Sequence, residues 1–313
     1  MTILIAVQGW DPAPWLERFR RLGVDRTVLD AREPFDPAAV RYAAVWKPKP
    51  GLLASLPNLK GIFNLGAGVD ALLADKTLPD KPIFRITNPD LTKRMTEWVT
   101  LQVLFHMRQM PAYMANQKAR QWKPLDQPGA HELRVGIMGM GILGRDSAEV
   151  LMRLGFKVAG WSRSRQSMPG LEAFAGTEEL PAFLARTDIL VVLLPLTEAT
   201  RGILNRDLFG KLAQNGAMGA PILINAGRGG LQSEADILAA LEDGTLGGAS
   251  LDVFEPEPLR PESPLWLHPK VIITPHISAD STPDGLVSGV LKDIAAFEAG
   301  ETLPNEVDRK TGY

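Results

Sequence analysis

The sequence contains no cysteine, and this absence excludes several kinds of chemistry. Without a thiol the chain can form no disulfide, offers a metal no thiolate ligand and has no cysteine nucleophile. A chain without cysteine fits a reducing compartment, so we expect a cytoplasmic protein.

Long apolar runs and an excess of positive charge are also missing. The longest strongly apolar stretch, "ILVVLLPL" (189–196), is far shorter than the roughly 20 residues of a membrane-spanning helix. The opening "MTILIAVQGW" has no basic region before its short apolar run, so it predicts a first strand rather than a signal peptide. The formal net charge of −2 gives no basic surplus for nucleic acid. We therefore expect neither a membrane nor a nucleic acid as partner.

Two catalytic patterns are absent as well. No group of His, Asp and Glu has the spacing of metal ligands, and no G-x-S-x-G motif occurs. We therefore expect no metal and no acyl hydrolysis.

What the chain does contain is a regular alternation of short, β-branched apolar runs with helical patterns. This alternation is typical of α/β proteins with parallel sheets. The predicted strands of a first series cover 3–7, 26–29, 43–46, 61–65 and 83–86. Those of a second series cover 134–138, 156–161, 188–194, 221–225, 248–253 and 271–275. The predicted helices cover 12–22, 92–107, 143–154, 177–186, 233–243 and 283–299.

The two series predict two domains. The stretch 121–132, rich in proline, glycine and glutamine, predicts a linker or surface loop before the second series. Six strands separated by crossovers are the number found in a Rossmann-type doubly wound sheet that binds a dinucleotide. We expect the last helix to return to the first domain.

A glycine motif supports a nucleotide site in the second series. "GMGILG" places Gly139, Gly141 and Gly144 between a predicted strand and a predicted helix. The spacing alone is weak evidence in a chain with 29 glycines. In this context the first glycine would make a tight turn, the second would admit a pyrophosphate, and the third would let the helix pack on the strand. The alternative is a strand–helix turn that is merely tight.

The end of the next predicted strand indicates which nucleotide. Dinucleotide sites for NAD place an Asp or Glu there, about 20 residues after the glycines. Here Ser162 takes that position, and Arg163 and Arg165 follow. With no carboxylate to repel a 2′-phosphate and two guanidinium groups to pair with it, we expect NADP to be preferred, with NAD possible. The alternative is a solvated basic turn.

Three reactive side chains follow successive strands of the second series. Arg228 lies in "ILINAGRGG", Glu257 in "LDVFEPEPL" and His276 in "VIITPHISA". The carboxyl ends of parallel strands meet at one edge of a sheet, where ligands bind. Reduction of a 2-oxo acid needs a cation for the carboxylate and ketone and a proton donor for the developing alkoxide. Arg228 suits the first task and His276 the second, while Glu257 would favour the imidazolium and orient it.

The chain resembles the D-isomer-specific 2-hydroxyacid dehydrogenase family, and is most similar to its glyoxylate/hydroxypyruvate reductase A branch. The motifs that carry the resemblance are "GMGILG", "LLPLTEATRGILN", "INAGRGG", "LDVFEPEPL", "ESPLWLHPKVIITPH", "LGAGVD" (65–70) and "VDRKTGY". The resemblance implies Arg228, Glu257 and His276 as the catalytic residues. It also implies a homodimer formed through the cofactor domain, and a small 2-oxo acid as substrate.

The resemblance extends the expected site. It implies that backbone N–H groups at Ala67, Gly68 and Val69 grip the substrate carboxylate, together with Arg228 and His276, and that Trp46 lines a small substrate pocket. Without the resemblance, "LGAGVD" could be a plain glycine turn and Trp46 a core aromatic. The expected cofactor contacts are Gly139, Gly141, Ile142, Leu143, Gly144, Ser162, Arg163, Arg165, Leu194, Pro195, Ala226 and Asp252. Of these, Asp252 is implied to touch the nicotinamide carboxamide.

We therefore expect a flavodoxin-like substrate domain at 1–98 and 280–313, and a dinucleotide-binding domain at 99–279. The resemblance implies that the active site lies between them. The glycines around Arg228 are interpreted as room for substrate and nicotinamide. Two other functions stay open at this point: a family dehydrogenase for a bulkier 2-oxo acid, and a protein that senses NAD(P) without turnover.

Some features depart from the pattern or have no place in it. "LAQNGAMGAPILIN" is a few residues longer than the usual family approach to its strand, so the loop near Gly216–Pro221 can differ. His106, His131 and His268 match no catalytic position, and we interpret them as structural.

Overall fold

The computed structural model describes residues 1–279, 282–309 and 312. The chain divides into two compact units: Met1–Leu91 with Ser281–Tyr313, and Thr92–Asp280. The division falls within helix α3 (Pro89–Met107), earlier than the expected boundary after residue 98. The physical reason is the apolar face of α3, because Met95, Val99 and Val103 all belong to a core cluster of the second unit.

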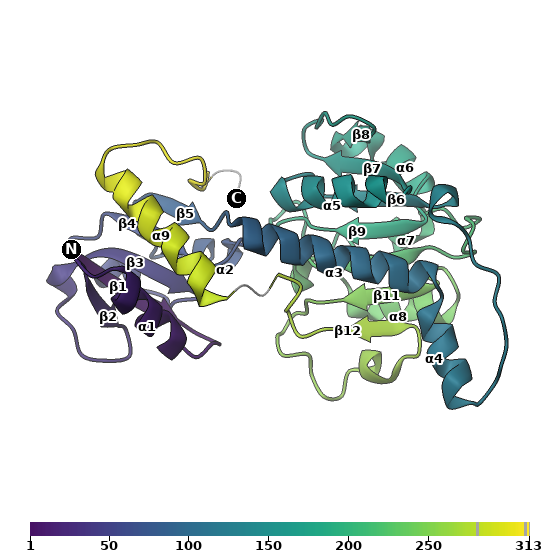
Figure 1. Cartoon of the computed structure of the whole chain (residues 1–313), viewed down its shortest axis with the longest axis horizontal. Helices are drawn as coiled ribbons and strands as arrows, with labels where there is room; N and C mark the ends of the chain where they lie inside the picture. Colours follow the sequence, from purple (N-terminus) through teal and green to yellow (C-terminus); the bar gives the residue numbers. More distant parts are fainter. Residues whose placement is uncertain (280–281, 310–311, 313) are drawn as a thin grey trace. The chain divides into compact units, whose positions relative to one another are not determined.

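The first unit is built on a parallel five-stranded sheet in the order β2-β1-β3-β4-β5 (Figure 1). Its strands are β1 (Thr2–Val7), β2 (Thr27–Asp30), β3 (Val40–Trp46), β4 (Gly61–Asn64) and β5 (Ile83–Arg85). This order is the flavodoxin-like one, and all five strands lie where the sequence predicts them.

Helices α1 (Ala13–Leu22) and α9 (Pro283–Glu298) lie side by side in the first unit. Ion pairs link α9 to the segment around α1, including Arg18–Asp284 and Arg26–Glu298. Behind them an aromatic group joins the sheet to α9, since Phe84 packs on both Phe63 and Phe297. The last helix therefore returns to the first unit, as expected. The remaining short helices are η1 (Pro37–Ala39), η2 (Leu53–Ser55) and α2 (Asp70–Leu73).

The second unit contains a parallel seven-stranded sheet in the order β12-β11-β10-β9-β6-β7-β8 (Figure 1). Its strands are β6 (Arg134–Met138), β7 (Lys157–Ser162), β8 (Glu172–Ala175), β9 (Ile189–Val192), β10 (Ile222–Asn225), β11 (Gly248–Leu251) and β12 (Val271–Ile273). From β8 to β11 this is the Rossmann order 3-2-1-4-5-6, which confirms the expected fold class.

The expectation of six strands was wrong, because the sheet has a seventh strand, β8, that the sequence did not predict. β8 pairs only with β7 at one margin of the sheet, and its four residues "EAFA" carry no β-branched side chain. A short edge strand needs little apolar surface, so its sequence shows almost no alternation of apolar and polar residues.

Helices cover both faces of the second sheet. Strand residues alternate between two core clusters: Ile189 and Val191 face one, Leu190 and Val192 the other. The first cluster also takes residues from α3 and α5 (Ile142–Arg153); the second takes residues from α6 (Gly176–Ala185), α7 (Arg206–Gly210) and α8 (Glu234–Glu242). Further short elements are α4 (Met110–Lys118), η3 (Ala130–Glu132), η4 (Gly229–Leu231) and η5 (Pro264–Leu267).

The segment expected to be a linker is coil up to η3. Gln127 donates to the Arg108 carbonyl and the Leu125 amide donates to the Tyr113 hydroxyl, so the loop is tied to α4 and the end of α3. Within the described part of the chain, no helix combines the length and the apolar character that crossing a membrane requires.

Candidate active site

The three predicted catalytic residues follow three neighbouring strands. β10, β11 and β12 are consecutive in the sheet, and the segments after them carry Arg228, Glu257 and His276 respectively. All strands of this sheet are parallel, so these segments leave from the same edge.

His276 and Glu257 are in direct contact. The His276 Nδ1 atom lies 2.9 and 3.0 Å from the two carboxylate oxygens of Glu257. A carboxylate can only accept, so Nδ1 carries the hydrogen and the other ring nitrogen is left for a separate partner. Glu257 is itself positioned by the Phe254 amide, which donates to it over 3.2 Å.

Asp252 holds the segment that carries His276. This fully buried carboxylate accepts hydrogen bonds from the amides of Ile277 and Ser278, at 2.9 and 3.0 Å, and from the Thr274 hydroxyl. His276 has a φ of +56°, a left-handed backbone conformation that a side-chain-bearing residue adopts only when its surroundings impose it. Positioning this turn is therefore a role of Asp252 that the sequence did not reveal.

The turn that carries Arg228 is fixed by Asn225, the last residue of β10. The fully buried Asn225 amide donates to the Arg228 carbonyl and to Gln232, and its oxygen accepts from the Gly227 amide. The Arg228 Nη1 atom donates to the Gly227 carbonyl over 2.6 Å.

The glycines around Arg228 have a different reason from the one we expected. A Cβ atom at Gly227 would lie 2.8 Å from the Leu194 carbonyl oxygen, and one at Gly229 would lie 1.9 Å from the Phe254 carbonyl carbon. Both positions are thus closed by the protein's own backbone. The turn is glycine-rich because it packs between the loops that follow β9 and β11.

The glycine motif between β6 and α5 has the geometry that a dinucleotide site requires. Gly139 has a φ of +105°, and a Cβ at Gly144 would lie 2.0 Å from the Gly139 carbonyl oxygen, so turn and helix packing account for these two. Gly141 differs, because a Cβ there would meet no atom within 4 Å. Its lack of a side chain is not demanded by packing, and it precedes Ile142 at the start of α5. The residues present therefore fit a pyrophosphate held by helix N-terminal amides.

The predicted 2′-phosphate residues lie after β7. Ser162 ends the strand, and its hydroxyl donates to the Ser164 carbonyl over 2.7 Å. Arg163 is exposed. Arg165 forms an ion pair with Glu179 of α6 and donates to the Ala173 carbonyl of β8.

The other expected cofactor residues sit near the same strand ends. Leu194 and Pro195 follow β9, Ala226 follows β10, and Leu143 belongs to the first turn of α5. Leu194 and Ala226 are buried.

In the first unit, Asn64 shapes the predicted carboxylate-binding loop. Its buried amide donates to the carbonyls of Gly66 and Gly68 over 2.8 and 2.9 Å. In a trans peptide the N–H points opposite to the C=O, so the amides of Ala67 and Val69 are directed away from Asn64. Nothing in the sequence singled out Asn64, although a polar residue ending a buried strand is a usable signal.

Trp46, at the end of β3, is fixed by stacking. Its ring lies parallel to that of Trp10, with centroids 4.7 Å apart, and Trp10 stacks in turn on Trp15. A Cβ at Gly66 would lie 2.1 Å from the Trp46 ring, so the ring presses on the loop that Asn64 shapes.

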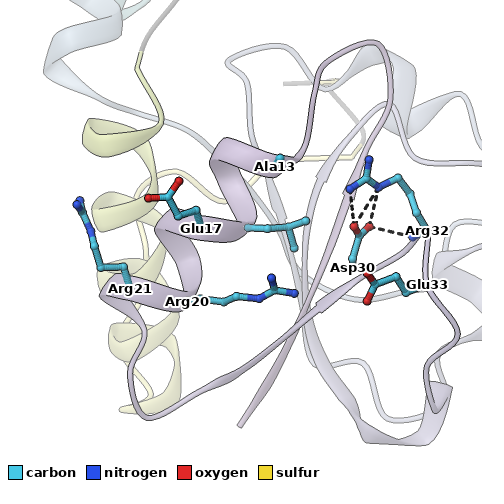
Figure 2. Close-up of a pocket in the computed structure, with 8 residues that line it drawn as sticks. Ala13, Glu17, Arg20, Arg21, Asp30, Arg32 and Glu33 are labelled. Atoms are coloured by element: carbon cyan, nitrogen blue, oxygen red, sulfur yellow. Dashed lines mark hydrogen bonds and ion pairs between the residues drawn. The ribbon is translucent and has the colours of Figure 1, made fainter.

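Two surface hollows bear little on these residues. One, of about 670 Å³ in the first unit, is lined by Arg20, Arg32, Asp30 and their neighbours (Figure 2). Arg32 clamps the Asp30 carboxylate there, and the charges in this hollow largely balance. The other, of about 390 Å³ in the second unit, touches only Ile142 among the predicted site residues.

The long loop near Gly216–Pro221 lies at the opposite edge from the catalytic residues. It precedes β10, and a Cβ at Gly216 would lie 2.0 Å from a carboxylate oxygen of Asp188, which precedes β9. Asp188 pairs with Arg134 at the start of β6. The loop therefore covers the amino ends of the strands.

The histidines interpreted as structural make no contact with Arg228, Glu257 or His276 in the described hydrogen bonds and ion pairs. His106 is buried in α3 and bonds to the Ser250 hydroxyl over 2.8 Å, and Ser250 donates to Gln102. The His268 Nδ1 atom accepts from the Lys270 amide. His131 is exposed.

The chain is similar to several known proteins over most of its length. The sequence model for "D-isomer specific 2-hydroxyacid dehydrogenase, NAD binding domain" matches residues 100–278. An NADPH-dependent glyoxylate/hydroxypyruvate reductase from Sinorhizobium meliloti, solved with NADP and sulfate, is 48% identical with a TM-score of 0.96, over 100% of this chain and 99% of that one. A probable 2-hydroxyacid dehydrogenase from Rhizobium etli, solved with NADP, HEPES and L(+)-tartaric acid, is 45% identical with a TM-score of 0.94 over the same shares. A D-isomer-specific 2-hydroxyacid dehydrogenase from Xanthobacter autotrophicus, solved with NADPH and MES, is 39% identical with a TM-score of 0.94, again over 100% and 99%.

Proposed function

Because the chain belongs to the D-isomer-specific 2-hydroxyacid dehydrogenase family, we propose that it reduces small 2-oxo acids with NADPH. The proposed reactions are glyoxylate to glycolate and hydroxypyruvate to D-glycerate. The hydrogen-bonded pair of His276 and Glu257, beside the strand that precedes Arg228, is the observation that carries this proposal. A protein that only sensed a nucleotide would have no use for an oriented proton donor.

Each residue has a task in the reduction. The Arg228 guanidinium binds the substrate carboxylate and polarises the ketone, and carboxylate binding is also assigned to the amides of Ala67, Gly68 and Val69. His276 donates a proton to the ketone oxygen as it becomes an alkoxide. Glu257 keeps the ring oriented and stabilises its charge before the transfer. When bound, the reduced nicotinamide supplies the hydride.

The cofactor is assigned to the carboxyl edge of the second sheet. Amides at Gly141, Ile142 and Leu143 would hold the pyrophosphate, and Arg163 and Arg165 the 2′-phosphate. Support comes from the open approach to Gly141 and from relatives solved with NADP or NADPH. Ser162 in place of an acidic residue favours NADPH over NADH.

Trp46 is assigned to the substrate side chain. A ring held between Trp10 and Gly66 cannot turn aside to admit a large substituent. We therefore propose a preference for the smallest 2-oxo acids.

A homodimer is part of the proposal. Trp122 is fully exposed, and Met110 and Met114 of the adjoining α4 are 37% and 56% exposed. Large apolar side chains gathered on one segment are typical of an interface. Light scattering on the wild type and on Trp122→Glu would test this: a dimer that becomes a monomer supports the interface, and an unchanged mass refutes it.

We place the protein in the cytoplasm.

The test of the function is a set of initial rates with glyoxylate, hydroxypyruvate, pyruvate and a larger 2-oxo acid, each with NADPH and with NADH. Oxidation of the reduced cofactor is followed by absorbance. The proposal expects glyoxylate and hydroxypyruvate with NADPH to give the highest kcat/KM. A higher value with the larger acid would favour a different dehydrogenase, and no turnover with any acid would favour a sensor.

A further inference from the structure

Glu179 lies where it can influence the cofactor site from outside. Its side chain reaches from the first turns of α6 to the segment after β7 and forms an ion pair with Arg165. Arg165 is one of two guanidinium groups that we assign to a 2′-phosphate. The same guanidinium would therefore interact with two anionic groups, the Glu179 carboxylate and the 2′-phosphate.

The Glu179 carboxylate is held in place independently of Arg165. Its other oxygen accepts from the Ala175 amide over 2.7 Å, at the N-terminus of α6. A negative charge at this end of a helix is stabilised by the helix dipole and by an amide that lacks a partner within the helix. A bound phosphate would thus have to compete with a carboxylate that stays where it is.

Arg165 is also constrained by the backbone around it. Its Nη1 atom donates to the Ala173 carbonyl of β8. The segment that carries it is anchored from the other side by Arg145 of α5, which donates to the Ser167 carbonyl over 3.0 Å and to Gln166. The backbone that carries Arg165 is therefore held near α5, and its guanidinium is held near β8 and α6.

We propose that Glu179 is a specificity-determining residue that weakens the preference for NADPH over NADH. This inference rests on the proposed function, because it assumes that Arg165 meets the 2′-phosphate. The Glu179 carboxylate occupies some of the N–H donors of the Arg165 guanidinium, so fewer remain for the phosphate. The carboxylate also repels the phosphate dianion of NADPH, whereas the neutral 2′-hydroxyl of NADH experiences no such repulsion. The pair is surface-exposed, so we expect a moderate effect, roughly threefold to tenfold in relative affinity.

The test is Glu179→Gln, which removes the charge and keeps one acceptor oxygen for the Ala175 amide, while the new NH2 group can only donate and therefore releases Arg165. Glu178→Gln is the matched control, because Glu178 is the adjacent exposed acid in the same helical turn and has the same formal charge. Two quantities are measured in each protein: the ratio of the Kd values of NADP⁺ and NAD⁺ by titration calorimetry, and the ratio of kcat/KM for NADPH and NADH with glyoxylate.

We expect Glu179→Gln to shift both ratios roughly threefold or more toward the phosphorylated cofactor, and Glu178→Gln to leave them near the wild-type values. An unchanged or opposite shift in Glu179→Gln, or an equal shift in both variants, would overturn the inference. The ratio of the Kd values can be measured without turnover. If the wild type binds NADP⁺ but reduces no 2-oxo acid, the proposed function is refuted, and the Kd ratios of the variants still test the role of Glu179. The inference would also be overturned if the wild type bound NADP⁺ and NAD⁺ equally well and Glu179→Gln did not increase the relative affinity for NADP⁺.

Discussion

The Nδ1 atom of His276 lies 2.9 Å from a carboxylate oxygen of Glu257, although the two residues follow different strands of the second sheet. This contact fixes which ring nitrogen carries the hydrogen and which remains for a substrate. The pair depends on Asp252, which ties down the turn after β12, and on the Phe254 amide, which holds Glu257. These contacts orient the His276 ring, as the proposed role of proton donor requires.

Glu257→Gln tests the orientation of the donor. The amide keeps the size of the side chain but removes the charge that stabilises the protonated ring. We expect kcat to fall by about 10- to 100-fold with KM for glyoxylate little changed. Glu255→Gln is the control, since Glu255 pairs with the exposed Arg201 instead. Equal kcat values in the two variants would contradict the role of Glu257.

Arg228→Ala removes the proposed substrate anchor. We expect KM for glyoxylate to rise and kcat to fall, together by about 100-fold or more in kcat/KM, because the guanidinium binds the carboxylate and also polarises the ketone. Arg228→Lys should recover part of the KM and little of the kcat, since an ammonium lacks the planar fork. The control is Arg206→Ala, which loses an exposed ion pair with Asp243. Wild-type kinetics in Arg228→Ala would remove the anchor from the mechanism.

Asn64→Ala tests the carboxylate-binding loop. Without the amide that holds the Gly66 and Gly68 carbonyls, the loop amides lose their common direction. We expect KM for glyoxylate to rise by roughly 10-fold while the Kd of NADP⁺ stays unchanged. Asn58→Ala serves as control, because Asn58 also donates to a backbone carbonyl, that of Ala38, but at an exposed site. A KM equal to that of the control would show that the loop does not need Asn64.

Arg165→Ala tests the 2′-phosphate assignment. We expect KM for NADPH to rise by about 10-fold or more and KM for NADH to stay near the wild-type value, because only NADPH carries the phosphate. Arg153→Ala removes a similar exposed arginine, paired with Glu149 on α5, and should leave both constants unchanged. Equal losses with both cofactors would argue that Arg165 supports the fold of this segment and not the phosphate.

His106 makes stability dependent on pH. Burial lowers the pKa of His106 to about 4, so the folded protein holds this ring neutral well below the pH at which it would protonate in the unfolded chain. Its contribution is fully present above about pH 6.5 and is lost as the pH falls toward 4, up to about 3 kcal/mol. Urea unfolding at pH 7 and at pH 4.5 should therefore show a smaller loss of stability in His106→Gln than in the wild type. His131→Gln, at the surface, should behave like the wild type; identical losses in all three proteins would contradict the assignment.

The sequence was most informative where the physics is local and repetitive. Buried parallel strands such as β9 and β10 are short apolar runs, and α3 places an apolar residue on the core at each turn, so both were predictable. β8 was not predictable, because an edge strand needs few apolar side chains. The division after Leu91 differs from the expected boundary after residue 98, because α3 is continuous in sequence although its first turn and the rest belong to different units.

The candidate site divides in the same way. Reactive residue types at strand ends could be found, which is why Arg228, Glu257 and His276 were singled out. The residues that support the site were not singled out: Asn64 and Asn225 act on turns two to four residues ahead of them, and Glu179 reaches Arg165 from another element, a contact that only the fold creates. The glycines beside Arg228 show the same limit, since the atoms that demand them, those of Leu194 and Phe254, lie on other strands' loops.

The most direct test of the account is the rate of NADPH oxidation by His276→Ala in the presence of glyoxylate, measured beside the Kd of NADP⁺ for the same protein. We predict an unchanged Kd and a kcat lower than that of the wild type by at least about 100-fold. A kcat within a few-fold of the wild type would mean that the proton comes from elsewhere and that the pairing of His276 with Glu257 is not what drives the reduction.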